Sequence, residues 1–183
     1  MLIHVSMVEQ ITYKVLKKVG NFEIREYPEI VVATTRYEGE NSAFNLLFQY
    51  ISGNNKSRKK IAMTSPVISS SEKIPMTSPV ISENEFMAFS LPKKYSKENT
   101  PIPINSQVSL KVIPERIIAV LRFSGKTSKK RIKKYSNELQ NLLIIEEFSS
   151  IGEVFLMRYN SPFTPGFLRR NEVAIELKNV DHL

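Results

Sequence analysis

Residues Pro28–Ser42 read PEIVVATTRYEGENS, and residues Pro114–Ser128 read PERIIAVLRFSGKTS. Aligned at an offset of 86 residues, six of these fifteen positions are identical, and the apolar positions between them agree in kind. Self-similarity at a fixed offset indicates a duplicated structural unit. The chain of 183 residues therefore predicts one domain built from two related halves.

Each copy predicts the same series of elements. An alternating strand over residues 22–26 or 108–112 leads through a proline turn to a β-branched strand. An amphipathic helix follows, with Ser42 and Ser128 as the expected N-caps. Further strands are expected over residues 61–68, 86–91, 154–159 and 172–177. The repeat is thus a ββαββ unit, and two such units predict an α+β fold with one antiparallel sheet or barrel and two helices.

The repeat also sets the expected domain boundaries. We expect a poorly ordered N-terminal extension over residues 1–12 and a C-terminal tail over residues 179–183. Between them lies a single domain, residues 13–178, with halves at about 13–98 and 99–178. The seam between the halves is the expected place for a ligand cleft, and the alternative is that side chains fill this seam.

A shorter repeat reads IAMTSPVIS at residues 61–69 and IPMTSPVIS at residues 74–82. The two prolines of the second copy predict an edge strand or a loop over the barrel rather than a central strand. Met63 and Met76 occupy equivalent places in the two copies, where they either fill gaps in the core or line a site.

The composition excludes several kinds of chemistry. The chain has no cysteine, and its two histidines, His4 and His182, stand near the chain ends. Disulfides, thiolate metal sites and a Ser-His-Asp triad in the core are thereby excluded, and no glycine-rich phosphate loop is present, so we expect no enzymatic activity. The longest apolar run, residues 117–121, is far shorter than the roughly 20 residues of a membrane span. No signal peptide is recognisable either, so we expect a cytoplasmic protein.

The formal net charge of +8 is concentrated in two clusters, residues 56–60 and residues 126–134. A solvated helix face, an anionic membrane surface and nucleic acid are the three interpretations of the second cluster. Tyr135 is the one aromatic residue beside it, and no nucleic-acid-binding signature is present. The solvated face is favoured, and nucleic acid is an unlikely partner.

Several of these segments resemble the SOUL haem-binding protein family. They are the doubled IAMTSPV and IPMTSPV, VIPERIIAVLRFSG at residues 112–125, YNSPFTPGFLRRNEVAIEL at residues 159–177, and residues 13–35 and 43–55. The resemblance extends from about Tyr13 to Leu177. It implies a distorted antiparallel β-barrel flanked by two helices, and a hydrophobic pocket that binds haem or a related tetrapyrrole.

The expected ligand-binding residues are Phe44, Leu47, Phe48, Met63, Met76 and Tyr159, with Arg58 as a partner for a propionate. Since the matching region holds no histidine, we expect binding by apolar burial of the porphyrin rather than strong histidine ligation. The remaining candidate iron ligands are Met63, Met76, Met157, Tyr37 and Tyr159. The expected partner is a hydrophobic anionic small molecule, which the protein carries or buffers. The alternative is a generic small-molecule sensor or interaction module on the same barrel, with little or no haem affinity.

Arg169 and Arg170 end a proline-rich loop and have two interpretations. They either receive an anionic ligand, or they fix the loop by bonding to backbone carbonyls and to carboxylates such as Glu172. The structural role is the favoured one.

Overall fold

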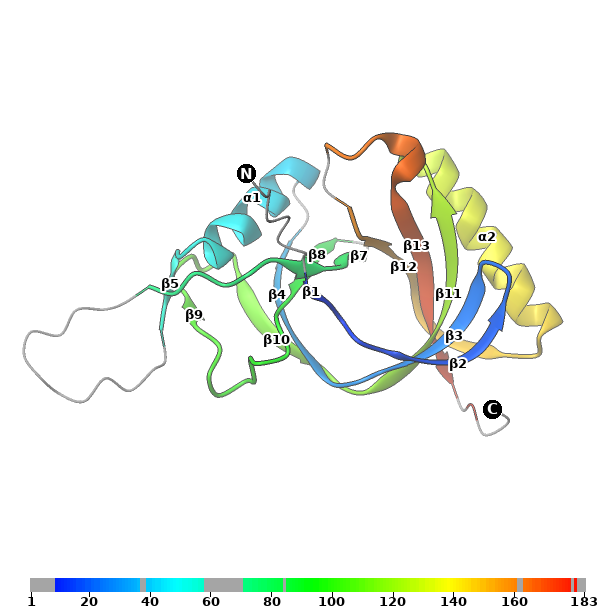
Figure 1. The fold of residues 1–183 in the computed structure, drawn as a ribbon, viewed down its shortest axis with the longest axis horizontal. Coiled ribbons are helices and arrows are strands. Elements are labelled where there is room, and N and C mark those ends of the chain that lie inside the picture. The colour runs from blue at the N-terminus through cyan, green and yellow to red at the C-terminus, as the bar shows by residue number, and fades with distance from the viewer. Residues whose placement is uncertain are drawn as a thin grey trace, which may run out of the picture.

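Two helices lie on a large antiparallel sheet, so the fold is α+β, as the sequence predicts (Figure 1). This computed structural model describes residues 9–36, 39–57, 71–83, 85–160, 163–178 and 180. The elements are β1 (Glu9–Gln10), β2 (Lys14–Val19), β3 (Phe22–Tyr27), β4 (Ile30–Arg36), α1 (Glu40–Ile51), β5 (Asn55–Lys56), β6 (Thr77–Ser78), β7 (Val80–Glu83), β8 (Phe86–Ser90), β9 (Ile102–Pro103), β10 (Ser109–Ile113), β11 (Arg116–Ser124), α2 (Lys129–Ile145), β12 (Ser149–Arg158), the 3₁₀ helix η1 (Gly166–Leu168) and β13 (Arg170–Lys178). The nine-stranded sheet has the order β10-β4-β8-β7-β12-β13-β11-β3-β2.

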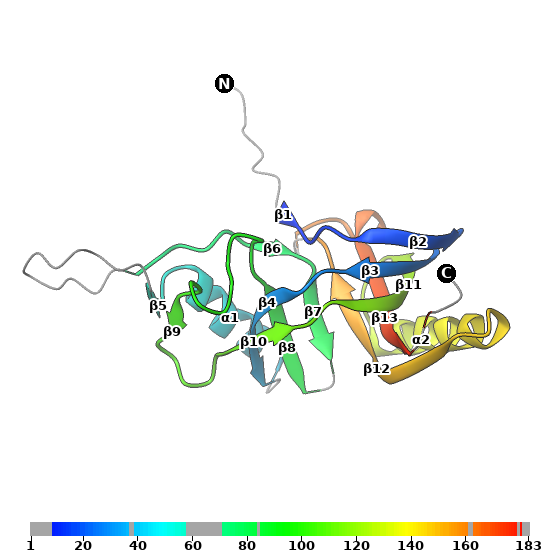
Figure 2. The same cartoon turned by 90° about the horizontal axis from the view of Figure 1, so that it is seen from below.

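The segment from β3 to β4 and the segment from β10 to β11 form one long strand pair. β4 pairs with β10 and β3 pairs with β11, both antiparallel. Arg116 lies opposite Tyr27 in one ladder, and the other ladder continues in the same register. Pro28–Glu29 and Pro114–Glu115 therefore face each other between the two ladders. Figures 1 and 2 show the two segments side by side along the whole molecule.

The two faces of the sheet carry separate hydrophobic cores. On the outer face, Leu47 and Tyr50 anchor α1 over β4 and β8, and Leu139 and Leu143 anchor α2 over β11 and β13. A third cluster lies on the opposite face, which we call the inner face, and draws residues from strands under both helices. We call the strands β10, β4, β8 and β7 the α1 side and the other five the α2 side. Neither helix could span a membrane.

The sheet is not the closed barrel that we expected. β10 and β2 are its two edges, and no ladder between described residues joins them. Pro28 and Pro114 lie where β3 passes into β4 and β10 passes into β11. Because proline has no amide donor, these residues mark the break between the β3–β11 ladder and the β4–β10 ladder. The observed architecture is an open, curved sheet, and the duplication remains an interpretation of the sequence.

The two helices begin differently. Ser128 caps α2, because its side chain accepts a hydrogen bond from the amide of Arg131, as predicted. The prediction for Ser42 is wrong, because α1 begins at Glu40 and the cap position is Gly39. Gly39 has a φ of 147°, a backbone conformation that favours glycine, so the chain enters the helix earlier than a serine cap would allow.

The prediction for the second copy of the short repeat holds only in its first part, because residues 74–79 lie outside the nine-stranded sheet and β6 pairs with β1. Residues 74–82 were expected at an edge or in a loop, yet β7 lies between β8 and β12 in the middle of the sheet. Pro75 and Pro79 both precede β7, so neither removes a donor from its ladders. The first copy, residues 61–69, lies outside the described residues, as does the strand expected over residues 61–68.

The N-terminal segment crosses the inner face (Figure 2). The sequence placed residues 9–12 in an extension, but here β1 pairs with β6 in parallel. The amide of Ile11 donates to the carbonyl of Ser78 at 3.0 Å, and the amide of Lys93 donates to a carboxylate oxygen of Glu9 at 3.1 Å. We call residues 9–13 the N-terminal strap.

Candidate ligand site at the inner face

The alternation of residues along each strand decides what reaches the inner face. In β13, Val173 and Ile175 pack beneath α2, whereas Ala174 belongs to the inner-face cluster. Successive side chains of a strand point to opposite faces, so Glu172 lies on the same face as Ala174. A carboxylate is thereby placed inside the molecule by the same pattern that builds the core.

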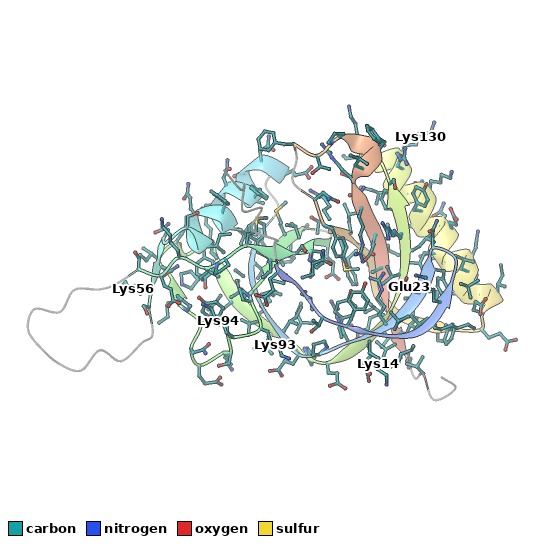
Figure 3. The ribbon with its side chains drawn as sticks, viewed as in Figure 1. Lys14, Glu23, Lys56, Lys93, Lys94 and Lys130 are labelled. Carbon is teal, nitrogen blue, oxygen red and sulfur yellow. The ribbon has the colours of Figure 1, made fainter. Side chains whose placement is uncertain are left out.

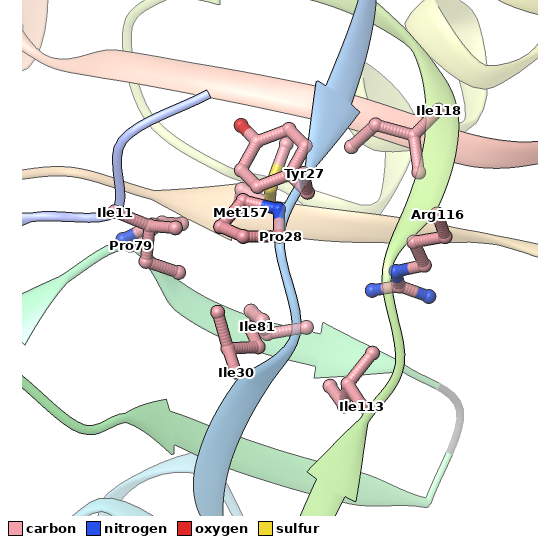
Figure 4. Close-up of a pocket in the computed structure, with 10 residues that line it drawn as sticks. All are labelled: Ile11, Tyr27, Pro28, Ile30, Pro79, Ile81, Ile113, Arg116, Ile118 and Met157. Atoms are coloured by element: carbon pink, nitrogen blue, oxygen red, sulfur yellow. The ribbon is translucent and has the colours of Figure 1, made fainter. Parts of the chain in front are cut away.

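The inner face is mostly apolar and is well filled. Its buried residues are Tyr27, Val32, Ile81, Ala88, Ile118, Val120, Phe155, Met157 and Ala174. A cavity of about 10 Å³ remains near the crossing of the repeated segments (Figure 4). A cavity of this volume has room for about one water molecule. The sequence predicted either a ligand cleft between the two halves or a seam filled by side chains. The structure is close to the second alternative.

A larger hollow lies beside this cavity. It has a volume of about 160 Å³ and shares Ile11, Pro28 and Ile30 with the smaller cavity. Leu91 and Tyr95 form part of its other wall. Ile11 belongs to the N-terminal strap, so the strap borders both the cavity and the hollow.

A buried ion pair closes the α2 side of the inner face. Two nitrogens of the Arg25 guanidinium donate to the two carboxylate oxygens of Glu172, at 2.7 and 3.0 Å. The third nitrogen of Arg25 donates to Glu23 at 2.7 Å. Arg25 and Glu172 are both almost completely buried, and such two-pronged pairing is what makes burial of these charges possible.

Further groups complete this network. Arg170 donates to one oxygen of Glu172 at 2.7 and 2.9 Å, and the Tyr159 hydroxyl donates to the other at 2.7 Å. Arg170 also donates to the Tyr13 hydroxyl at 3.1 Å and stacks on the Tyr159 ring at 4.0 Å. The Tyr13 ring lies 4.3 Å from the Arg25 guanidinium, so the N-terminal strap ends against the network. We call Arg25, Tyr159, Arg170 and Glu172 the inner polar network.

The network shifts the pKa of its members. Burial alone would raise the pKa of Glu172, but the hydrogen bonds and charge of Arg25, assisted by Tyr159 and Arg170, lower it below its ordinary value. Burial, reinforced by the negative charge of Glu172, raises the pKa of Tyr159. At neutral pH the site therefore holds an ionised carboxylate and a protonated phenol. Among the described residues, no cluster of acidic or histidine side chains could hold a metal ion.

The arginines of the loop have the structural role that we favoured. Arg169 donates to the carbonyl of Thr164 at 2.7 Å, and Arg170 binds Glu172 as described above. The Arg169 bond fixes the loop to itself, and the Arg170 bond holds a carboxylate of the strand that follows the loop.

The structure separates the expected ligand-binding residues into two groups. On the α1 side, Leu47 is fully buried in the outer core, and Met76 is half-buried against that core. Phe44 contacts Phe89 edge-on at 5.2 Å, and the half-exposed Phe48 stacks on Phe44 at 6.1 Å. Tyr159 lies apart from these residues, in the inner polar network. Arg58, Met63 and Tyr37 lie outside the described residues, as do both histidines.

Sequence reasoning missed Arg25, Tyr13 and Tyr27 as parts of a site. The available signal was the alternation in β3, where polar Glu23 and Arg25 interleave with apolar Phe22 and Ile24. Such a strand normally has a solvated polar face. The sequence does not show that Tyr13 of the N-terminal strap and Glu172 of β13 meet Arg25 on that face and bury it.

Comparison with known proteins identifies the class. The family model of the SOUL haem-binding protein matches residues 8–176. The chain therefore belongs to the SOUL haem-binding protein family, as its sequence motifs indicate. Comparison with curated protein sequences gives no significant match.

Solved structures share the fold at low identity. The C-terminal domain of EcmrR aligns with a TM-score of 0.57 and 12% identity, over 92% of this chain and 99% of that one. EcmrR in a complex with DNA aligns with a TM-score of 0.54 and 9% identity, over 88% and 59%. A hydrolase from Listeria innocua aligns with a TM-score of 0.54 and 12% identity, over 89% and 94%. At these identities the matches establish the fold alone.

Proposed function

We propose that this protein binds haem or a related tetrapyrrole at its inner face, for carriage or buffering in the cytoplasm, without histidine ligation and without a catalytic step. Membership of the SOUL family supports the ligand class. One observation supports this location for the ligand. The cavity wall is apolar but includes a positively charged side chain, because Arg116 lines the cavity together with Ile113 and Ile118 (Figure 4). A flat hydrophobic anion needs this combination of apolar surface and a positive group.

Arg116 is suited to a propionate. Its guanidinium lies 5.0 Å from the Phe155 ring and donates to Glu176 at 3.3 Å, a long bond to a partly exposed carboxylate. An incoming carboxylate can replace this weak partner at little cost, because exposed ion pairs contribute about 1 kcal/mol or less. Arg25 is a poorer candidate, since its donors are already committed to Glu172 and Glu23.

The ligand has to displace part of the protein in order to bind. Pockets for drug-sized ligands measure about 300–1,000 Å³, which exceeds both the cavity and the hollow beside it. Ile11 of the N-terminal strap lines both spaces. Displacing Ile11 and its neighbours would join the spaces, so we propose that binding moves the strap.

Met157 is the proposed residue to face the iron. Phenolate rather than phenol is the form in which tyrosine ligates, and the raised pKa of Tyr159 keeps its proton in place. Of the methionines proposed as ligands that the structure describes, Met157 lines the inner cavity and Met76 lies toward the outer core. Met157 thus offers a thioether without an ionisation step.

The expected affinity is modest. Burying about 400 Å² of apolar porphyrin surface contributes roughly 10 kcal/mol, at about 25 cal/mol per Å². Association costs at least about 4 kcal/mol, and displacing the strap adds to this cost. A dissociation constant in the micromolar range at best follows.

A haemin titration of the full chain, followed by the Soret band, tests the proposal. We expect saturation at one equivalent, and the same result in the double variant His4→Ala, His182→Ala. Arg116→Gln should weaken binding severalfold, and Met157→Leu, which conserves volume, should change the spectrum. Phe48→Ser, on the exposed surface of α1, is the matched control and should change neither.

Two results would reject parts of the proposal. If Phe48→Ser weakens binding and Arg116→Gln does not, the ligand binds beside α1, where Phe44, Phe48 and Met76 were expected to line the site. If no saturable shift occurs in any of these proteins, the alternative of a small-molecule sensor or interaction module replaces haem binding.

A further inference from the structure

The loop that carries η1 exposes large apolar side chains. Phe163 is 95% exposed, Phe167 is 77% exposed and Leu168 is 61% exposed. These residues lie within one short segment between β12 and β13, at the edge of the molecule where α2 begins (Figure 1). Isolated exposed apolar residues are ordinary on a protein surface, but three on one loop form a patch.

Lysines surround this patch. A Cβ at Gly166 would lie 3.6 Å from Cγ of Lys126, so the η1 loop contacts the segment that leads into α2. Lys129, Lys130 and Lys133 are exposed on the first turns of that helix, and its first turn has no acidic residue. Figure 3 shows Lys130 beside the η1 loop. We call Lys126, Lys129, Lys130, Lys133 and the apolar residues of the η1 loop the basic apolar tip.

The position of these lysines is unfavourable for the helix. Cations at a helix N-terminus oppose the macrodipole and destabilise the helix slightly. Within the helix start, Arg131 donates to the carbonyl of Ser124, which accounts for one cation in the fold. No comparable bond to a described residue is seen for Lys129, Lys130 or Lys133, and all three are exposed, so their charges are available to a partner.

An anionic lipid surface matches both properties of the tip. Lysines near such a surface each contribute about tenfold or less to the binding constant, and apolar side chains enter the boundary between headgroups and acyl chains. Nucleic acid fits less well, because Tyr135, the aromatic residue beside the lysines, stacks on Phe123 at 4.3 Å and is not free for bases.

We propose that the basic apolar tip binds the surface of an anionic bilayer, with Phe167 and Leu168 inserted at the interface and the lysines over the headgroups. The attachment is peripheral and reversible, since it uses one loop and the first turns of one helix. It uses neither the inner face nor the N-terminal strap, so it stands independently of the proposed ligand.

Vesicle flotation of the full chain tests this inference. We expect binding to vesicles of phosphatidylcholine with about a third phosphatidylserine, and little binding to phosphatidylcholine alone. The double variant Lys129→Glu, Lys130→Glu should lose binding by roughly a hundredfold or less, and added salt should weaken the wild type. Lys56→Glu, Lys93→Glu changes the net charge equally and, lying away from the tip (Figure 3), should retain most binding.

A matched pair of variants tests the apolar contribution to vesicle binding. Phe167→Ser should weaken vesicle binding at least severalfold, whereas Ile144→Ser should not. Ile144 is 75% exposed at the far end of α2, so it matches Phe167 in exposure but not in position.

Tryptophan fluorescence locates the contact directly, because the chain contains no tryptophan. Phe167→Trp should shift its emission to the blue when anionic vesicles are added, and Ile144→Trp should not. Equal responses of the two probes, or equal loss in both charge-reversal variants, would overturn the inference. So would binding to random-sequence DNA that is lost in Lys129→Glu, Lys130→Glu and unchanged in Phe167→Ser, if vesicles are not bound.

Discussion

At the scale of single residues, Glu172 is the centre of the inner polar network. Its two carboxylate oxygens bind Arg25, Arg170 and Tyr159 in a buried setting. Removing one partner of a buried ion pair leaves an uncompensated charge and costs about 3–5 kcal/mol. We expect Glu172→Gln to lower the free energy of unfolding by about that amount in urea denaturation.

Glu176→Gln is the control for this prediction. Glu176 stands on the same strand and accepts one bond from Arg116, at a partly exposed position. Its loss should cost about 1 kcal/mol or less. Equal costs for the two variants would show that the inner polar network contributes no more than a surface pair.

The same carboxylate makes stability depend on pH. The pKa of Glu172 is lower in the folded protein than its ordinary value of 4.5, so below about pH 4.5 the unfolded chain binds the proton more readily. The stabilisation from Glu172 is complete above this pH and is lost as the pH falls through the folded-state pKa. Urea denaturation between pH 7 and pH 3 should show this loss in the wild type. Glu172→Gln should give a flatter profile, and parallel profiles would contradict the assignment.

Single residues were predictable where local chemistry decides their role. Arg170 follows a proline-rich loop and stands two residues from Glu172, so its structural role could be expected from the sequence. Arg25 is 147 residues from Glu172 along the chain, and the pairing of β3 with β11 could not be inferred from the alternation in β3 alone. Long-range strand pairing decides which polar residues become buried.

At the scale of elements, the two helix starts allow a direct comparison. Both Ser42 and Ser128 were expected to cap a helix, but only Ser128 accepts an amide hydrogen bond, at 3.4 Å and in an exposed position. We expect Ser128→Ala to lower the free energy of unfolding by about 0.5–1 kcal/mol, the low end of the range for N-caps.

Ser42→Ala should leave the free energy of unfolding within about 0.5 kcal/mol, because Ser42 is exposed inside the first turn of α1 and alanine is the better helix former. Urea denaturation of both variants measures the difference. A larger cost at Ser42 than at Ser128 would contradict these helix starts.

Strands and helices were predictable where the apolar pattern is periodic. They were less predictable where the neighbouring strands determine an element's position in the sheet. The strand expected over residues 172–177 is β13, and its Val173, Ile175 and Leu177 pack beneath α2. The prolines around β7 suggested an edge, because the sequence does not show that pairing begins only after Pro79. The site was predictable only in part, since Tyr159 was expected but its neighbours on other strands were not.

At the scale of the whole molecule, the two sides of the sheet share their strands. β3 and β4 are consecutive, yet β3 pairs on the α2 side and β4 on the α1 side, and β10 and β11 are divided in the same way. Neither side can therefore unfold without disturbing a strand of the other. We expect one cooperative transition, with coincident urea curves from far-UV circular dichroism and tyrosine fluorescence. Separate midpoints would show that the two sides fold independently.

The placement of β3 and β4 on different sides of the sheet also affects folding during translation. A chain leaves the ribosome from its N-terminus, and β3 is complete at Tyr27, but its neighbour β11 begins at Arg116. At about 5–20 residues per second, roughly 4–18 s separate the two. During that interval Phe22 and Ile24, which later pack against α2, have no core to enter.

The nascent chain thus carries an unpaired strand edge for much of its translation, which is a hazard for aggregation and a binding site for chaperones. Translation-arrest force measurements should register a single pulling event once β13 has emerged, and none at about residue 98. An event at the earlier length would mean that the α1 side folds while the rest is still being made.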